Sequence, residues 1–145
     1  MEVIHCFNKQ GHYKAKSVVV WCYDARFRPG LVCYTTSRGE FDLVSIAGGA
    51  KALASPDKDS EREFVLKQIL TSIKLHSTEE VVLMVHTDCG AYGGSKAFEN
   101  VKKEEEFLRD ELEKAKKHVQ ELLESNNLSA KITLLMVNFD QIEKW

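Results

Sequence analysis

The stretch that decides the fold is Val81-Val-Leu-Met-Val-His86-Thr-Asp-Cys89-Gly90, in which a wholly apolar run ends in polar residues and a glycine. A second stretch, Ser17-Val-Val-Val-Trp-Cys22-Tyr-Asp24-Ala-Arg26, has the same organisation. Continuous apolar runs are typical of strands covered on both faces, as in a parallel sheet. We therefore expect two strands of one sheet, with their polar clusters at the same edge.

The rest of the chain alternates between predicted strands and predicted helices. Four buried strands are expected, over residues 17–23, 41–46, 81–86 and 132–138. Ser60-Glu-Arg-Glu63 has the form of a capping box and predicts the start of a helix. A highly charged helix is predicted over 96–125, ending at Asn126-Asn127. Its apolar stripe also suits a coiled coil, but packing on the sheet explains it more simply. This alternation predicts a single three-layer α/β domain over residues 1–145.

Composition excludes several classes of function. The chain has 145 residues, 43% of them hydrophobic, which suffices for one domain with a core. Its net charge of −2 provides no basic field for nucleic acid or an anionic membrane. No apolar run approaches the roughly 20 residues of a membrane span. The N-terminal residues do not resemble a secretion signal, so we expect a cytoplasmic protein whose four cysteines are reduced.

The residue types after the two apolar runs indicate a metal site. Two cysteine thiolates and one histidine imidazole, from Cys22, His86 and Cys89, form a ligand set for Zn²⁺ that can leave a fourth position open. Two thiolates and a neutral imidazole also cancel the charge of the ion. Glycines at positions 90, 93 and 94 allow close backbone approach after Cys89.

Asp24 and Arg26 add an acid–base pair to this predicted site. A guanidinium beside a carboxylate keeps it ionised and orients its lone pairs. If the chain stays extended, Cys22, Asp24 and Arg26 project to one side. Asp24 can then accept a hydrogen bond from a zinc-bound hydroxide, or bind the zinc itself as a fourth ligand. An ordinary salt bridge at the end of a strand is a third interpretation of the pair.

The two motifs together resemble those of the β-class carbonic anhydrases. Cys22-x-Asp24-x-Arg26 resembles the family's first zinc motif with its aspartate–arginine pair, and His86-x-x-Cys89-Gly90 resembles the second. Residues 41–49 are similar to an apolar strand that ends, in that family, in an Ala-Gly turn near the metal. The resemblance extends from about residue 17 to about residue 138.

The resemblance implies a fold and an activity. The fold is a mainly parallel sheet of four strands, in the order 2-1-3-4, flanked by helices. The activity is a zinc-dependent, reversible hydration of CO₂ to bicarbonate by a zinc-bound hydroxide. The family also implies a homodimer or a larger dimer-based oligomer, with the N-terminal arm, residues 1–16, at the dimer interface.

The same resemblance assigns roles to individual residues. It implies Zn²⁺ on Cys22, His86 and Cys89, catalytic roles for Asp24 and Arg26, and a substrate pocket that includes Gly48, Gly49 and Gly90. Two other functions stay open. The same zinc can serve the hydrolysis of linear substrates such as CS₂ or COS, and a zinc protein can also be non-catalytic.

The chain departs from the family pattern in several places. Ala25 replaces the serine that usually precedes the arginine, and Ser45-Ile46 replaces an Arg-Asn pair. The chain also ends soon after the fourth predicted strand, so we expect no fifth strand.

Several other polar residues are weaker candidates for the site. Tyr92 is interpreted as a packed side chain rather than a proton relay. Thr87 and Asp88 are interpreted as caps of a following helix rather than as residues that orient the neighbouring ligands. Exposed or interfacial positions are expected for His5 and His12, and positions on helix surfaces for His76 and His118. The charged residues 102–106 are expected to form a solvated helix face.

Overall fold

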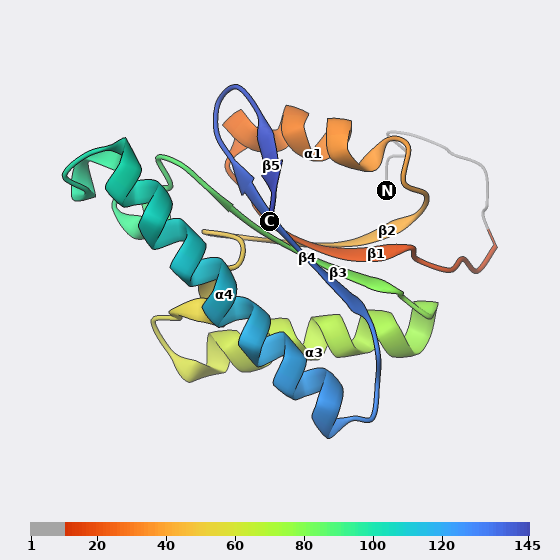
Figure 1. Cartoon of the computed structure of the whole chain (residues 1–145). Helices are drawn as coiled ribbons and strands as arrows, with labels where there is room; N and C mark the ends of the chain where they lie inside the picture. The colour runs from red at the N-terminus through yellow and green to blue at the C-terminus, as the bar shows by residue number, and fades with distance from the viewer. Residues whose placement is uncertain (1–10) are drawn as a thin grey trace, which may run out of the picture.

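A five-stranded sheet forms the centre of the computed structural model, which describes residues 11–145 (Figure 1). The strands lie in the order β2-β1-β3-β4-β5. Their bounds are β1 Ser17–Cys22, β2 Phe41–Ile46, β3 Glu80–His86, β4 Lys131–Val137 and β5 Ile142–Lys144. The first four are parallel to their neighbours, and β5 runs antiparallel to β4. The predicted α/β class and the order 2-1-3-4 are confirmed.

The expectation of only four strands is wrong, because the chain turns back after β4 and adds β5. The side chain of Asn138 makes this turn by accepting hydrogen bonds from the backbone N–H groups of Asp140 and Gln141, at 2.9 and 2.8 Å. The resulting strand has only three residues. A segment this short gives no recognisable pattern of alternation in the sequence.

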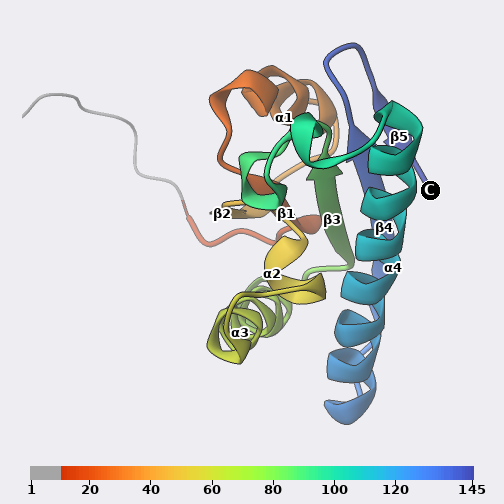
Figure 2. The ribbon, with the colours of Figure 1, turned by 90° about the vertical axis from the view of Figure 1, so that its left-hand side faces the viewer.

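Helices cover both faces of the sheet, which gives the predicted three layers. Helix α1 (Arg28–Thr35) lies on one face, and α3 (Asp59–His76) and α4 (Val101–Ser125) lie on the other (Figures 1 and 2). The short helix α2 (Lys51–Ala54) contacts both α3 and α4. Successive strand residues point to opposite faces. Val18 and Val20 therefore pack toward α3 and α4, and Val19 and Trp21 toward α1.

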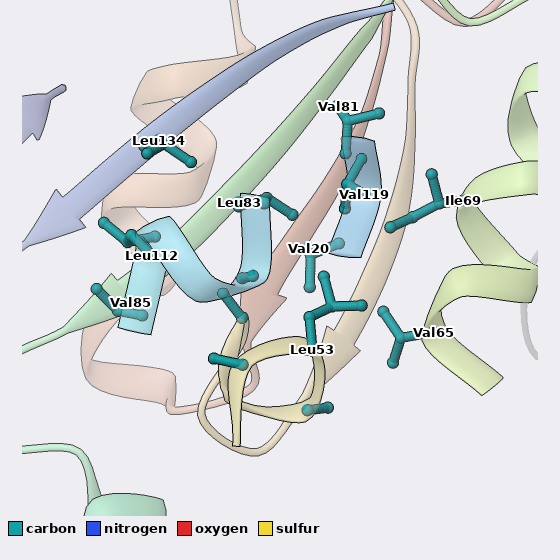
Figure 3. Close-up of a cluster of buried hydrophobic side chains, with 14 of the residues drawn as sticks. Val20, Leu53, Val65, Ile69, Val81, Leu83, Val85, Leu112, Val119 and Leu134 are labelled. Carbon is teal, nitrogen blue, oxygen red and sulfur yellow. The ribbon is translucent and has the colours of Figure 1, made fainter. Parts of the chain in front are cut away.

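The larger core lies between the sheet and helices α2, α3 and α4. Figure 3 shows apolar side chains of β1, β3 and β4 meeting those of the three helices. Leu53 of α2 is fully buried there, close to Val20 of β1. The apolar stripe of α4 packs on this core, as expected for a helix laid against a sheet.

The helix boundaries differ in part from the predicted ones. The capping box at Ser60 is wrong, because α3 begins at Asp59 and Lys58 precedes it without a side-chain cap. The Glu61 carboxylate instead accepts a hydrogen bond from the backbone N–H of Asp57, at 3.1 Å. Helix α4 begins at Val101, five residues later than predicted, and its predicted end at Asn126 is confirmed.

Strand β2 is less buried than the continuous apolar pattern predicted. It pairs only with β1 and so forms one edge of the sheet, and its residues are either partly buried or exposed, with none fully buried. Strands β1 and β3, by contrast, are buried along their whole length. Across residues 11–145, no helix has both the length and the apolarity needed to cross a bilayer.

Candidate metal centre

Three predicted metal ligands meet at the carboxyl edge of the sheet. Cys22 is the last residue of β1 and His86 is the last residue of β3, and these two strands are neighbours. The loop after β3 brings in Cys89. The sulfur and nitrogen atoms of the three side chains lie within 4.8 Å of one another, and all three residues are buried. No other group of this kind occurs in the described residues.

The orientation of His86 leaves one ring nitrogen free for an ion. Its Nδ1 lies 2.8 Å from the carbonyl oxygen of Thr87, so Nδ1 carries the proton and donates it there. Its Nε2 is buried and has no hydrogen-bond partner. The ring also stacks on Phe27, with centroids 4.1 Å apart, which restrains its rotation. A buried nitrogen lone pair without a partner is unfavourable, so the donor set fits a metal ion.

The two thiols of the cluster titrate as a pair. A hydrogen bond from Cys89 lowers the pKa of the Cys22 thiol to about 4, and His86 contributes in the same direction. The pKa of Cys89 is raised, because its proton is held by Cys22 and because the thiol is buried. The first proton therefore leaves readily, and a cation in the cluster would favour loss of the second.

Asp24 and Arg26 form an ion pair beside this cluster. The chain does not stay extended after Cys22, because Asp24 caps a 3-10 turn, Ala25–Phe27, that folds Arg26 back. The guanidinium donates from Nε to both carboxylate oxygens, at 3.1 Å each, and from one terminal nitrogen to Oδ2, at 2.7 Å. These hydrogen bonds lower the pKa of Asp24 to about 2. Asp24 is not part of the three-residue cluster.

Asp88 is a second partner of Arg26 that the sequence interpretation missed. Arg26 donates to Asp88 Oδ2, at 2.7 Å, and to the Asp88 carbonyl oxygen, at 3.0 Å. The predicted helix cap at Asp88 is wrong, since the chain directly after Cys89 forms a 3-10 turn, Gly90–Tyr92, and α4 begins only at Val101. Asp88 instead joins the two motifs. The signal available in the sequence is a carboxylate between the two residues of the second motif, together with the arginine that ends the first motif.

Glu104 was also missed. It belongs to the charged run 102–106, which was expected to be solvated, yet it is only 2% exposed. Its carboxylate accepts hydrogen bonds from the Asp88 backbone N–H, at 2.6 Å, and from Ser95 Oγ, at 2.7 Å. Glu104 lies four residues before the buried Leu108 and so continues the buried face of α4. The sequence signal that could have identified Glu104 is the position of its carboxylate within the apolar stripe of α4.

An open cavity of about 540 Å³ lies over the cluster. Its walls are mainly small residues with two ligands and the carboxylate of Asp24, and its lining consists of Cys22, Tyr23, Asp24, Ala25, Ala47, Gly48, Cys89, Gly90 and Ala91. Two of the three glycines predicted for a substrate pocket, Gly48 and Gly90, therefore line this cavity. Gly49 does not; it packs against the backbone of β1 and β3.

The side chains of two weaker candidates, Tyr92 and His76, have hydrogen-bond partners outside the cluster. The hydroxyl of Tyr92 donates to Glu111, at 3.1 Å, and its ring packs edge-on against Phe107, which agrees with a packed tyrosine. His76 is not a plain surface residue, because its Nδ1 lies 2.7 Å from Asp42 Oδ2 in a partly buried pair.

The other histidines and the remaining thiols lie elsewhere. His12 is exposed with its ring beside that of His76, and His118 lies on the surface of α4 near Glu121. His5 and Cys6 lie outside the described residues. Cys33 is an exposed free thiol.

Comparisons with known proteins agree with this geometry. A family model described as "Putative carbonic anhydrase" matches residues 12–143. A search of curated protein sequences finds no match.

Solved structures share the fold at low sequence identity. A carbonic anhydrase from Streptococcus mutans superposes with a TM-score of 0.60 at 19% identity, covering 95% of this chain and 87% of its own. A β-carbonic anhydrase from Trichomonas vaginalis gives 0.60 at 16% identity, covering 97% and 87%. A carbon disulfide hydrolase in its apo form gives 0.54 at 18% identity, covering 92% and 79%.

The structural matches show the fold, and the family model covers nearly the whole described chain, including both motifs. The chain belongs to the family described as "Putative carbonic anhydrase".

Proposed function

We propose that this protein is a zinc-dependent carbonic anhydrase that converts CO₂ and water into bicarbonate and a proton, and back. One observation carries the proposal. Cys22, His86 and Cys89 converge in a buried cluster with an unpartnered His86 Nε2, beside an ionised Asp24 and beneath an open cavity. Family membership and the fold agree with it.

The three ligands suit Zn²⁺ in charge and type. Cys22 and Cys89 would bind as thiolates, and His86 would bind through Nε2 while Nδ1 stays on the Thr87 carbonyl. A bound zinc ion supplies Lewis acidity, which lowers the pKa of water and makes hydroxide available near neutral pH. Because the chain would supply only three ligands, a fourth position on the ion would be available to water.

Asp24 and Arg26 would orient the attacking oxygen. With a pKa of about 2, Asp24 is ionised at physiological pH and only accepts hydrogen bonds. An O–H group in the cavity that donates to Asp24 has its lone pair directed away from the carboxylate, toward a substrate. Arg26 keeps the carboxylate in this orientation and balances its charge. This role and direct binding of Asp24 to the metal exclude each other at any instant.

The cavity walls suit a small, uncharged, linear molecule. Ala47 and Ala91 present methyl groups, and Gly48 and Gly90 present only backbone. Ala25, where the family usually has serine, contributes no hydroxyl to this wall. CO₂ needs little more than apolar contact and an oriented nucleophile, so the loss of that hydroxyl is compatible with hydration.

Stopped-flow CO₂ hydration at pH 7 and pH 8.5, with and without a chelator, tests the proposal. The expected result is a rate that disappears with the chelator and returns with added zinc. Cys22→Ser should abolish the rate, and the matched control Cys33→Ser, at an exposed thiol, should keep it. Absence of a zinc-dependent rate at both pH values would contradict the proposal.

A second candidate uses the same site for CS₂ or COS. The similarity in fold to a carbon disulfide hydrolase supports this candidate. The apolar wall of the cavity suits a linear sulfur compound as well as it suits CO₂. Release of H₂S from CS₂ or COS, measured on the same zinc-loaded protein, separates the two substrates. Full zinc content with no turnover of any of them would indicate a non-catalytic zinc protein.

The homodimer remains a prediction, which sedimentation at several concentrations can test.

A further inference from the structure

Glu104 is a buried carboxylate that the proposed chemistry does not use. It lies on α4, and its side chain reaches the loop that carries Cys89. Burial of a carboxylate is unfavourable unless hydrogen bonds compensate for the lost water. Both oxygens of Glu104 have such partners, the Asp88 N–H at 2.6 Å and Ser95 Oγ at 2.7 Å. Both partners belong to the metal-ligand loop or to its continuation.

The group that Glu104 holds has an unusual backbone conformation. Asp88 has a φ of +53°, in the left-handed region that residues other than glycine seldom adopt. Such a conformation persists only where the surroundings restrain it, and it is enriched at functional sites. Here the restraints are the hydrogen bond from the Asp88 N–H to Glu104 and the one from the Ser95 N–H to Asp88 Oδ1, at 3.0 Å.

Asp88 transmits this restraint in two directions. Along the chain, it lies between the predicted ligands His86 and Cys89, so its φ helps set the path from one to the other. Across the site, its side chain and carbonyl oxygen receive two hydrogen bonds from Arg26, which in turn holds Asp24. A shift of Asp88 would therefore move the ligand loop and the acid–base pair together.

We propose that Glu104 is a positioning residue of the metal centre: by fixing the backbone of Asp88, it sets the geometry of the His86–Cys89 loop and of Arg26. The proposal rests on the proposed function only in that zinc fills the cluster. It requires no particular substrate. Glu104 acts from outside the cavity and would touch neither the metal nor the substrate.

Metal binding by Glu104 variants tests this role without any activity assay. Zinc affinity is measured by competition with a chromogenic chelator, and Co²⁺ loading gives a visible spectrum that reports the ligand geometry. Loss of residues that orient metal ligands typically weakens affinity by about 10- to 100-fold, and we expect this of Glu104→Ala. Its Co²⁺ bands should also shift or broaden.

Two comparison variants separate positioning from a general loss of stability. Glu104→Gln keeps an acceptor for the Asp88 N–H and a donor for Ser95 Oγ, so affinity should stay within about fivefold of the parent. Glu80→Ala is the matched control. Glu80 is also buried and paired, with Thr133 and Lys131, but it begins β3, whose other end is His86. It should lower stability and leave the zinc affinity and the Co²⁺ spectrum unchanged.

The zinc affinities and Co²⁺ spectra of these variants decide whether Glu104 positions the metal centre. Equal zinc affinity and equal Co²⁺ spectra in Glu104→Ala and Glu80→Ala would overturn the proposal. If Glu104→Ala does not fold, Glu104→Asp replaces it, because the shorter side chain keeps the charge but cannot reach both partners. Parent-like affinity and spectra in Glu104→Asp would then overturn it. A parent protein that binds zinc but hydrates no CO₂ would contradict the proposed function and leave this test intact.

Discussion

Replacing Gly49 by alanine tests how tightly the loop after β2 packs against strands β1 and β3. Gly49 has a φ of +58°, and a Cβ at this position would lie 2.4 Å from the Met84 carbonyl oxygen and 3.2 Å from the Cys22 nitrogen. Both atoms belong to the backbone of buried strands, so neither can move without distorting the sheet. The left-handed conformation costs a non-glycine residue about 1 kcal/mol. Overpacking of a rigid site adds about 1–3 kcal/mol.

The expected loss is therefore about 2–4 kcal/mol, a large share of the roughly 5–15 kcal/mol that stabilises a domain. Gly39→Ala is the control. Gly39 also has a positive φ, +84°, but its nearest neighbour would be Lys16 Cβ at 3.7 Å, an ordinary contact. It should lose only the conformational part, about 1 kcal/mol. Urea denaturation of both metal-free variants gives the two free energies of unfolding. Equal losses would refute the steric argument.

Three further predictions concern the ligands, the core and a distant ion pair. Cys22→Ser should reduce bound zinc to a trace after dialysis, while Cys33→Ser leaves it unchanged; retention of zinc by Cys22→Ser would count against the ligand set. Leu53→Ala should lower the free energy of unfolding, measured by urea denaturation, by about 2–5 kcal/mol. Leu75→Ala, at an exposed position, should change it by about 0.5 kcal/mol or less, and similar losses in the two variants would contradict the assigned core. Burial alone would raise the pKa of Asp42, but three side-chain hydrogen bonds outweigh it and hold this pKa below its usual 3.8. Its contribution to stability is thus present above about pH 4 and is lost as the pH falls further, so Asp42→Asn should flatten the dependence of the unfolding free energy on pH below about 4. An unchanged slope in the metal-free protein would contradict this.

The convergence of Cys22, His86 and Cys89 could be predicted from the sequence because their positions depend on few assumptions. Two apolar runs that form neighbouring parallel strands must end at the same edge of the sheet, whatever the rest of the chain does. Cys22 and His86 follow directly from this rule, and Cys89 needs only a short turn. The same rule brought Ala47 and Gly48, which follow β2, to the cavity.

The contacts of Asp88 and Glu104 could not be predicted with the same ease. Hydrogen bonds between side chains depend on how loops turn, and local sequence patterns do not determine those turns. The sequence favours a helix cap at Asp88, yet Asp88 is an ion-pair partner, because the segment directly after Cys89 is a 3-10 turn and not an α-helix. Glu104 looked solvated because its neighbours are charged. Its burial depends on which face of α4 meets the loop, and that is a tertiary contact.

The ion pairs of Arg26 with Asp24 and Asp88 therefore contribute to the protein in a different way from the apolar core. The side chains of Arg26 and Asp88 are 45% and 40% exposed, and ion pairs this exposed contribute little to stability because water screens them. Their value lies in direction, since the planar guanidinium fixes the orientation of two carboxylates at once. Glu104 differs because its carboxylate is buried. A buried carboxylate needs hydrogen-bond partners, and Glu104 finds them in the loop at Asp88 and Ser95. Stability thus comes from the apolar strands, and the geometry of the site depends on one buried carboxylate that anchors an exposed network.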